Sequence, residues 1–189
     1  MTAYALELRQ HITPLQNRYD LVGVTASGQE TPLGYAEQKR FSLKEKVTFW
    51  ADAGKTQIAF TLSARNLFEL AGTYDVLDGA GAPVCVISKD LVSSFLRSTY
   101  RIDVGGRQLV GQERSMLRAV ARRVFSAVSD LPWFLPIQFD VVDSVGNVAL
   151  TIDRQPKLRD VYRVSVNDDR LDWRVAAAMA VAVDAFMNR

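Results

Sequence analysis

The sequence predicts a mainly β fold, in which one large closed antiparallel sheet surrounds a hydrophobic helix at the C-terminus. Three observations predict it. About eleven segments alternate apolar and polar side chains, as half-buried strands do. Several of the turns between them share one residue pattern, and the last segment is a helix that is apolar on every side.

The predicted C-terminal helix covers residues 172–187, and no polar side chain occurs from Val175 to Val183. A helix that is apolar all round is either buried in a core or spans a membrane. A span needs roughly 17–25 apolar residues, and the uncharged run between Arg174 and Asp184 is about half of that. We therefore expect a slim, alanine-rich, buried helix. Its expected core residues are Trp173, Val175, Met179, Val183, Asp184 and Phe186.

Asp184 is the charged residue of that set. It shares a helix face with Ala180, Ala177 and Trp173. A buried carboxylate must be hydrogen-bonded. We expect it near the barrel mouth, or bonded by backbone amides or an arginine, with Arg101 and Arg163 as candidates.

The predicted strands form a meander from about residue 19 onward. Their expected ranges are 19–24, 33–41, 44–51, 57–62, 67–76, 84–88, 98–104 and 108–111, and the series continues after residue 136. Residues 1–15 fit a strand or a short helix equally, so they stand as an uncertain N-terminal extension of a single domain, 1–189.

One turn pattern recurs along the meander, with Asp first and Gly fourth. It occurs at Asp78–Gly81, Asp103–Gly106 and Asp143–Gly146. The Asp carboxylate can accept hydrogen bonds from the turn amides, and Gly tolerates the left-handed backbone conformation. The pattern predicts successive antiparallel hairpins.

The meander also contains an internal repeat. Tyr74–Asp78 matches Phe139–Asp143, and Thr99–Ile102 matches Val161–Val164, with Arg18–Leu21 as a degenerate third copy of the first motif. A repeated unit of several strands without a linker favours one closed sheet over two domains.

Residues 113–129 predict an amphipathic helix outside the sheet. Arg114, Arg118 and Arg122 recur at steps of four on one face, with Arg123 beside them. Arginines attract anionic headgroups at about 1 kcal/mol each near a membrane surface. The simpler interpretation is a solvated face opposite an apolar stripe that packs on the sheet.

Composition adds few functional constraints. Lys and Arg number 23 against 21 Asp and Glu, a net charge of +2, which does not by itself indicate nucleic-acid binding. The single cysteine, Cys85, lies in a strand-like run and predicts an inert core thiol. With no leader-like N-terminus and no apolar run of membrane length, we expect a cytoplasmic protein.

No residue pattern of a catalytic, metal or cofactor site is visible. The chain lacks a Gly-rich phosphate loop, a His/Cys set with metal-ligand spacing and a Ser–His–Asp arrangement. Asn167–Asp169 is expected to close a hairpin rather than bind an ion. We therefore expect a protein that is not an enzyme, with no cofactor and no metal.

The Tyr74–Asp78 motif with Gly81 and Ile87–Lys89, its second copy, and the closing Asp172–Ala185 together resemble the LURP-one-related and phospholipid scramblase branch of the tubby-like proteins. The resemblance implies a closed barrel of about twelve strands threaded by the C-terminal helix. A helix about 10 Å across needs such a barrel, because eight strands leave room only for side chains. The cysteine cluster and Pro-rich arm of scramblases have no counterpart here. The basic residues with which tubby proteins bind phosphoinositides cannot be matched individually.

Three functions remain open at this stage. The first is a non-enzymatic binding protein of the tubby-like, LURP-one-related type. It would dock on anionic phospholipid at a membrane surface through Arg114, Arg118, Arg122 and Arg123, as a cytoplasmic or peripheral membrane protein. The second is a protein–protein scaffold or regulatory adaptor. The third is nucleic-acid binding, which ranks lower because the net charge is small.

Overall fold

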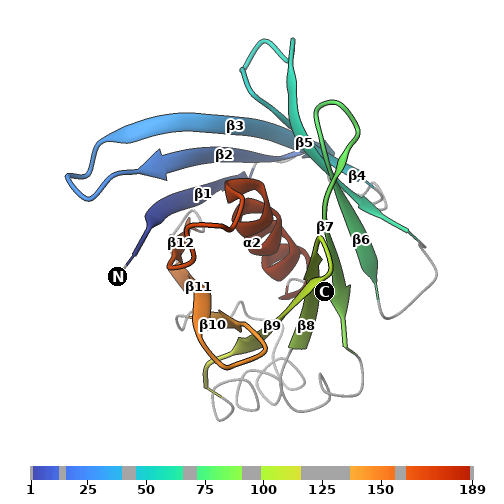
Figure 1. The fold of residues 1–189 in the computed structure, drawn as a ribbon. Helices are drawn as coiled ribbons and strands as arrows, with labels where there is room; N and C mark the ends of the chain where they lie inside the picture. Colours follow the sequence, from blue (N-terminus) through green and yellow to red (C-terminus); the bar gives the residue numbers. More distant parts are fainter. Residues whose placement is uncertain are drawn as a thin grey trace, which may run out of the picture.

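The computed structural model describes residues 2–12, 16–39, 46–65, 72–90, 99–115, 137–155 and 161–187. In this part of the chain, twelve strands form a closed barrel and one helix lies inside the ring (Figure 1). The strands are β1 (Tyr4–Ile12), β2 (Gln16–Val24), β3 (Glu30–Lys39), β4 (Lys46–Trp50), β5 (Ile58–Ala64), β6 (Thr73–Asp78), β7 (Pro83–Lys89), β8 (Thr99–Val104), β9 (Arg107–Glu113), β10 (Ile137–Val142), β11 (Val148–Gln155) and β12 (Val161–Val166). The helix is α2 (Trp173–Met187).

The barrel is a simple meander. Each strand pairs antiparallel with the next one in the chain, and β1 closes the ring against β12, with Tyr4 opposite Val166 and Leu6 opposite Val164. The predicted fold class is therefore confirmed. Residues 4–12, for which a helix was an alternative, form the strand that closes the barrel.

Alternation along each strand creates the core. In β10, Ile137, Phe139 and Val141 are buried, and the residues between them are partly exposed. Successive side chains of a strand point to opposite faces of a sheet. Every strand can therefore give one face to the interior, where the helix lies.

The helix fills the barrel as a slim apolar rod. From Val175 to Val183 its side chains are at most 2% exposed, and Asp184 is 1% exposed. Gly111 of β9 faces the helix: a Cβ there would make a tight contact of 3.3 Å with Val141 and an ordinary contact of 3.4 Å with the Cε of Met179. Complete burial of a valine or methionine side chain, as along this helix, contributes about 1.5–3 kcal/mol to folding stability. No helix of the described residues is both long and apolar enough to cross a membrane.

The barrel has two distinct ends, which we name by the helix. At the near end α2 begins, and Tyr4 at the start of β1 hydrogen-bonds the carbonyl of Leu171. At the far end α2 finishes, and Gln10, late in β1, contacts Asp184. Since the strands alternate in direction, odd-numbered strands end at the far end and even-numbered strands end at the near end.

The recurring turns have the predicted geometry. A carboxylate oxygen of Asp78 accepts from the amides of Ala80 and Ala82, and that of Asp143 accepts from Val145 and Asn147, at 2.8–3.0 Å. The fourth-position glycines have φ of 85° or 88°, a left-handed conformation that favours glycine. Asp103 also accepts from a turn amide, that of Gly106, at 2.8 Å.

Two predictions need correction in the described residues. Strand β9 continues through Glu113, which is 2% exposed, so the predicted helix over 113–129 does not begin there. Residues 116–129 lie outside the described part of the chain. Asn167–Asp169 does not close a hairpin: it leads from β12 towards α2, and the amides of Asn167 and Asp168 both donate to the carbonyl of Ala149.

Candidate functional site

The far end of the lumen contains a buried polar cluster around Asp184. Tyr162 donates to one carboxylate oxygen at 2.6 Å, and Tyr19 donates to the other at 2.9 Å. The side-chain amide of Gln10 lies 3.4 Å from the second oxygen. All four side chains are at most 3% exposed. The cluster provides the donors that a buried carboxylate requires.

The arginines expected to bond Asp184 are elsewhere. Arg163 pairs with Glu7 at 2.9 Å and Arg101 pairs with Asp90 at 2.7 Å, both on the outside of the barrel. In each Tyr–Arg motif the tyrosine is 0% exposed and the following arginine faces solvent. Period-two alternation explains the error, because adjacent strand residues point to opposite faces. Sequence reasoning singled out the correct motif and chose the wrong member of it.

The arginines proposed for headgroup binding share one connection of the chain. Arg114, the first residue after β9, forms an ion pair with Asp140 of β10 at 2.6 Å on the outer surface. Its pKa is raised by the hydrogen bonds to Asp140, against the opposing effect of burial. Arg118, Arg122 and Arg123 lie outside the described residues. All four belong to the segment that joins β9 to β10, and both strands have those termini at the far end.

The two ends also differ in the charge of their connecting segments. Far-end segments hold more Arg and Lys than Asp and Glu; they are residues 13–15, 40–45, 65–72, 90–98, 114–136 and 156–160, most of them outside the described part. Near-end segments hold more Asp than Lys and Arg; they are residues 25–29, 51–57, 79–82, 105–106, 143–147 and 167–172. The sequence of the connecting segments therefore differs in net charge between the two sets.

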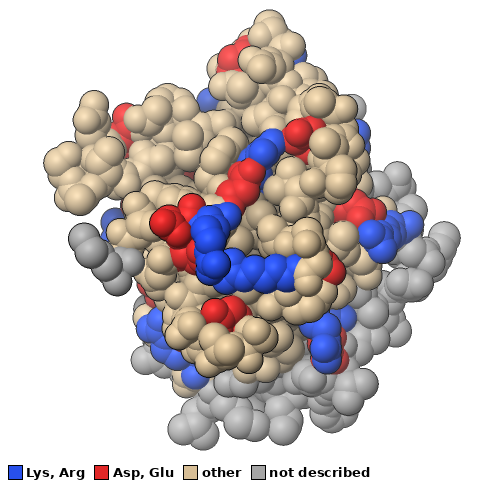
Figure 2. Space-filling model, viewed as in Figure 1, with Lys and Arg blue, Asp and Glu red and all other residues tan. Residues whose placement is uncertain are grey.

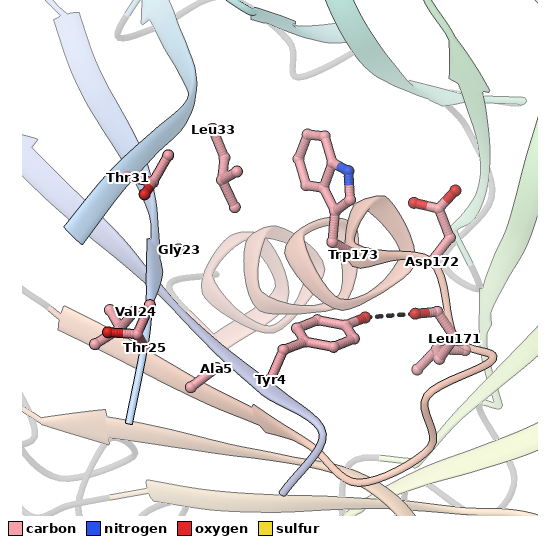
Figure 3. Close-up of a pocket in the computed structure, with 10 residues that line it drawn as sticks. All are labelled: Tyr4, Ala5, Gly23, Val24, Thr25, Thr31, Leu33, Leu171, Asp172 and Trp173. Carbon is pink, nitrogen blue, oxygen red and sulfur yellow. Dashed lines mark hydrogen bonds between the residues drawn. The ribbon is translucent and has the colours of Figure 1, made fainter. Parts of the chain in front are cut away.

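At the near end an apolar pocket of about 450 Å³ opens beside the start of the helix (Figure 3). We call it the near-end pocket; its lining residues are Tyr4, Ala5, Gly23, Val24, Thr25, Thr31, Leu33, Leu171, Asp172 and Trp173. Figure 3 shows the ring of Trp173 facing Leu33, the ring of Tyr4 close to the first turn of α2, and the Asp172 side chain beside that turn. Sequence reasoning placed Trp173 in the core and did not find this pocket.

Asp172 fixes the start of the helix and is one of the residues that line the pocket. Its carboxylate accepts from the backbone amide of Arg174 at 2.8 Å, as an N-cap residue does, and from the Arg174 guanidinium at 2.6–3.1 Å. Burial raises the pKa of Asp172, but these bonds from Arg174 outweigh it and hold the pKa below its usual range.

A second carboxylate at the near end bonds two arginines. Asp168 is 3.0 Å from Arg170 and 2.5 Å from Arg107. The bond from Arg170 holds its pKa well below the usual range, against the effect of burial, and Arg107 adds to the lowering. Figure 2 shows the same arrangement more widely, with basic side chains lying against acidic ones on the face viewed.

The described residues show neither a metal-binding cluster nor a reactive thiol. Among them, no group of three or more His, Cys, Asp or Glu side chains could hold a metal. Burial, with smaller contributions from Asp172 and Asp103, raises the pKa of Cys85 to about 12, which disfavours the reactive thiolate.

The fold defines the class of protein. An antiparallel barrel of twelve strands closed around a C-terminal helix is the tubby-like architecture that the sequence motifs implied. A family model described as LURP-one-related matches residues 34–184, so the chain belongs to the LURP-one-related family of the tubby C-terminal-like superfamily. A comparison with curated proteins gives no match.

Proposed function

We propose that this LURP-one-related protein is a non-enzymatic binding protein that docks on anionic phospholipid at the cytoplasmic surface of a membrane through the far end of its barrel. The proposal rests on the difference in net charge between the segments that join the strands at the two ends. Basic residues outnumber acidic ones in the segments that join strands at the far end, and acidic residues outnumber basic ones in the segments that join strands at the near end. An anionic surface attracts the first end and repels the second.

The β9–β10 connection supplies the strongest positive charge. It carries Arg114, Arg118, Arg122 and Arg123, and continues into Trp133, Phe134 and Leu135. Aromatic side chains favour the membrane interface, and arginines favour anionic headgroups. The ion pair of Arg114 with Asp140 ties the beginning of this segment to the barrel wall.

The barrel interior supports binding at the surface rather than catalysis in the lumen. The buried faces of the strands and α2 fill it, with Val175, Met179 and Val183 at most 1% exposed. A lumen of this kind leaves no volume for the ligands that wider open barrels enclose. Recognition is therefore assigned to the ends and outer surface of the barrel.

Vesicle sedimentation tests the proposal. The protein should sediment with vesicles of phosphatidylcholine and phosphatidylserine and stay in solution with phosphatidylcholine alone. Binding should weaken as salt rises, because the screening length falls to about 8 Å at physiological ionic strength. Replacing Arg114, Arg118, Arg122 and Arg123 by Gln should reduce affinity about a hundredfold or more, given about 1 kcal/mol for each arginine.

The chain offers a matched control. Arg107→Gln with Arg170→Gln removes two positive charges from the near end, and should leave vesicle binding unchanged or only slightly weaker. The proposal fails if the far-end variant binds as the parent does, or if both lipid compositions bind equally. Absence of vesicle binding at low salt would favour the scaffold function, and displacement by duplex DNA with a steep salt dependence would favour nucleic acid.

A further inference from the structure

The near-end pocket is not used by the proposed membrane docking, and its volume is in the range of small-molecule sites. Such sites occupy about 300–1,000 Å³ and combine apolar walls with a few polar groups. Here the walls include Leu33, Val24 and Leu171, and the polar groups include Thr31 and Asp172. A second hollow adjoins it across Leu33 and Trp173, and is lined by Asp78 and Arg174.

Two aromatic rings are fixed at the pocket wall. Tyr4 donates its hydroxyl hydrogen to the carbonyl of Leu171, which holds the ring beside the start of α2. The ring of Trp173 packs edge-on against Phe60, with centroids 5.7 Å apart and an interplanar angle of 82°. Aromatic faces attract cations, Trp most strongly, and rings that are already held rigid lose little entropy on binding.

The charges around the pocket disfavour an anion. Arg174, the cation of the adjoining hollow, is bonded to Asp172 at 2.6 Å and lies 3.8 Å from Asp78, so two carboxylates surround one guanidinium. The pKa of Tyr4 is raised, first by burial and then by Asp172 and Asp168, which agrees with a negative potential at the pocket.

We propose that the near-end pocket binds a small organic cation, in which an apolar alkyl or aryl chain carries an ammonium group. The chain would occupy the apolar volume beside Leu33. The ammonium group would lie at the helix start, close to the ring of Trp173 and to Asp172, both of which line the pocket. The site goes beyond membrane docking and lies at the opposite end of the barrel.

A ligand series of constant chain length separates the charge from the apolar contribution. Octylamine, octanol and octanoate, each as free monomers, are titrated into the full chain by calorimetry at neutral pH. We expect octylamine to bind about two- to fivefold more tightly than octanol, the range given by an exposed cation–aromatic contact. Octanoate should bind more weakly than octanol.

Two variants locate the site. Asp172→Asn keeps an N-cap side chain and removes the charge, so the preference for octylamine over octanol should become smaller while the affinity for octanol is unchanged. Thr31→Trp, at an exposed position of β3, should fill the pocket and remove binding of all three compounds. Asp143→Asn, a near-end carboxylate outside the pocket, should change nothing.

The titrations of the unmodified protein test the proposal even if a variant folds poorly. Absence of saturable binding of octylamine, or octanoate binding as tightly as octylamine, would overturn the proposal. So would an unchanged preference for octylamine in Asp172→Asn, or unchanged binding in a folded Thr31→Trp. None of these results bears on vesicle binding, which is assigned to the far end.

Discussion

The two ends of α2 have different surroundings. At the near end the helix begins at Trp173, a partly exposed side chain that borders an apolar pocket. Towards the far end, Asp184 is almost completely buried and is bonded by Tyr162 and Tyr19. One helix thus has a hollow beside its first turn and a polar network around its last turns.

The difference between the two ends indicates which of them can accept a small ligand. A polar network whose members are bonded to one another rigidifies its surroundings and is costly to disturb. Space beside a helix start, walled by apolar and aromatic side chains, can accept a ligand without breaking such bonds. This contrast supports the proposals that a small molecule binds in the near-end pocket and that a membrane surface is bound through the segments that join strands at the far end.

The largest expected effect comes from the middle of the helix, which both ends depend on. Val181→Asp places an unpaired charge at a position that is 2% exposed, which costs several kcal/mol. The melting temperature should fall by about 10 °C or more, or the chain should fail to fold. Thermal unfolding followed by circular dichroism measures this. The control Val145→Asp, at a position 78% exposed, should melt with the parent. Equal melting of both variants would show that α2 is not central.

Next in size is the far-end network. Asp184→Ala leaves the buried hydroxyls of Tyr162 and Tyr19 without their acceptor, and each such group costs about 1–3 kcal/mol. We expect a loss of about 2–5 kcal/mol in the free energy of unfolding. A double-mutant cycle of Asp184→Asn with Tyr162→Phe should give a coupling of about 0.5–3 kcal/mol, and additive losses would contradict the network.

A smaller loss is expected at the near end. Trp173→Ala removes the edge contact with Phe60, but the side chain is already partly exposed and borders a hollow. The truncation should therefore cost about 1–2 kcal/mol, well below the usual cost for a fully buried aromatic. Urea unfolding gives the value. A loss equal to that of Asp184→Ala would remove the contrast between the two ends.

The smallest expected effect is a change in the pH dependence of folding stability, caused by Asp168 at the near end. The pKa of Asp168 is held below its usual range in the folded state by Arg170 and Arg107, so its contribution is complete above the unfolded pKa of about 4. That contribution is lost as the pH falls through the lower folded pKa. Asp168→Asn should make the loss of stability below about pH 4 less steep, by urea unfolding at several pH values. The neighbouring Asp169→Asn is the control, and an identical acid profile in both variants would contradict the assignment.

The fold could be predicted from the sequence because its signals are local. An uncharged apolar helix, repeated Asp–Gly turns and alternating strands each fix their own element, and the repeated Tyr–Arg motif marks equivalent places on β8 and β12. The partner of Asp184 was missed because the motif offers two polar side chains on opposite faces. Only the inward face, set by register, reaches the helix.

The near-end pocket could not be predicted, because no local signal describes it. Its walls come from β1, β2, β3 and the start of α2, which are far apart in the chain. Register irregularity between Leu21 and Val22, where β2 pairs with β3, falls close to Gly23 and Leu33 of this pocket. A bulge of this kind re-aims side chains and is set by tertiary pairing.

The orientation of the protein on a membrane is the most direct test of the account. A fluorophore is attached to Ser115→Cys at the far end or to Val145→Cys at the near end. Cys85 is buried with a raised pKa, so the new thiol reacts preferentially. Vesicles of phosphatidylcholine and phosphatidylserine that carry a lipid-linked quencher are then added. The account predicts strong quenching at position 115 and little at position 145. Stronger quenching at 145, or equal quenching at both, would contradict docking through the far end.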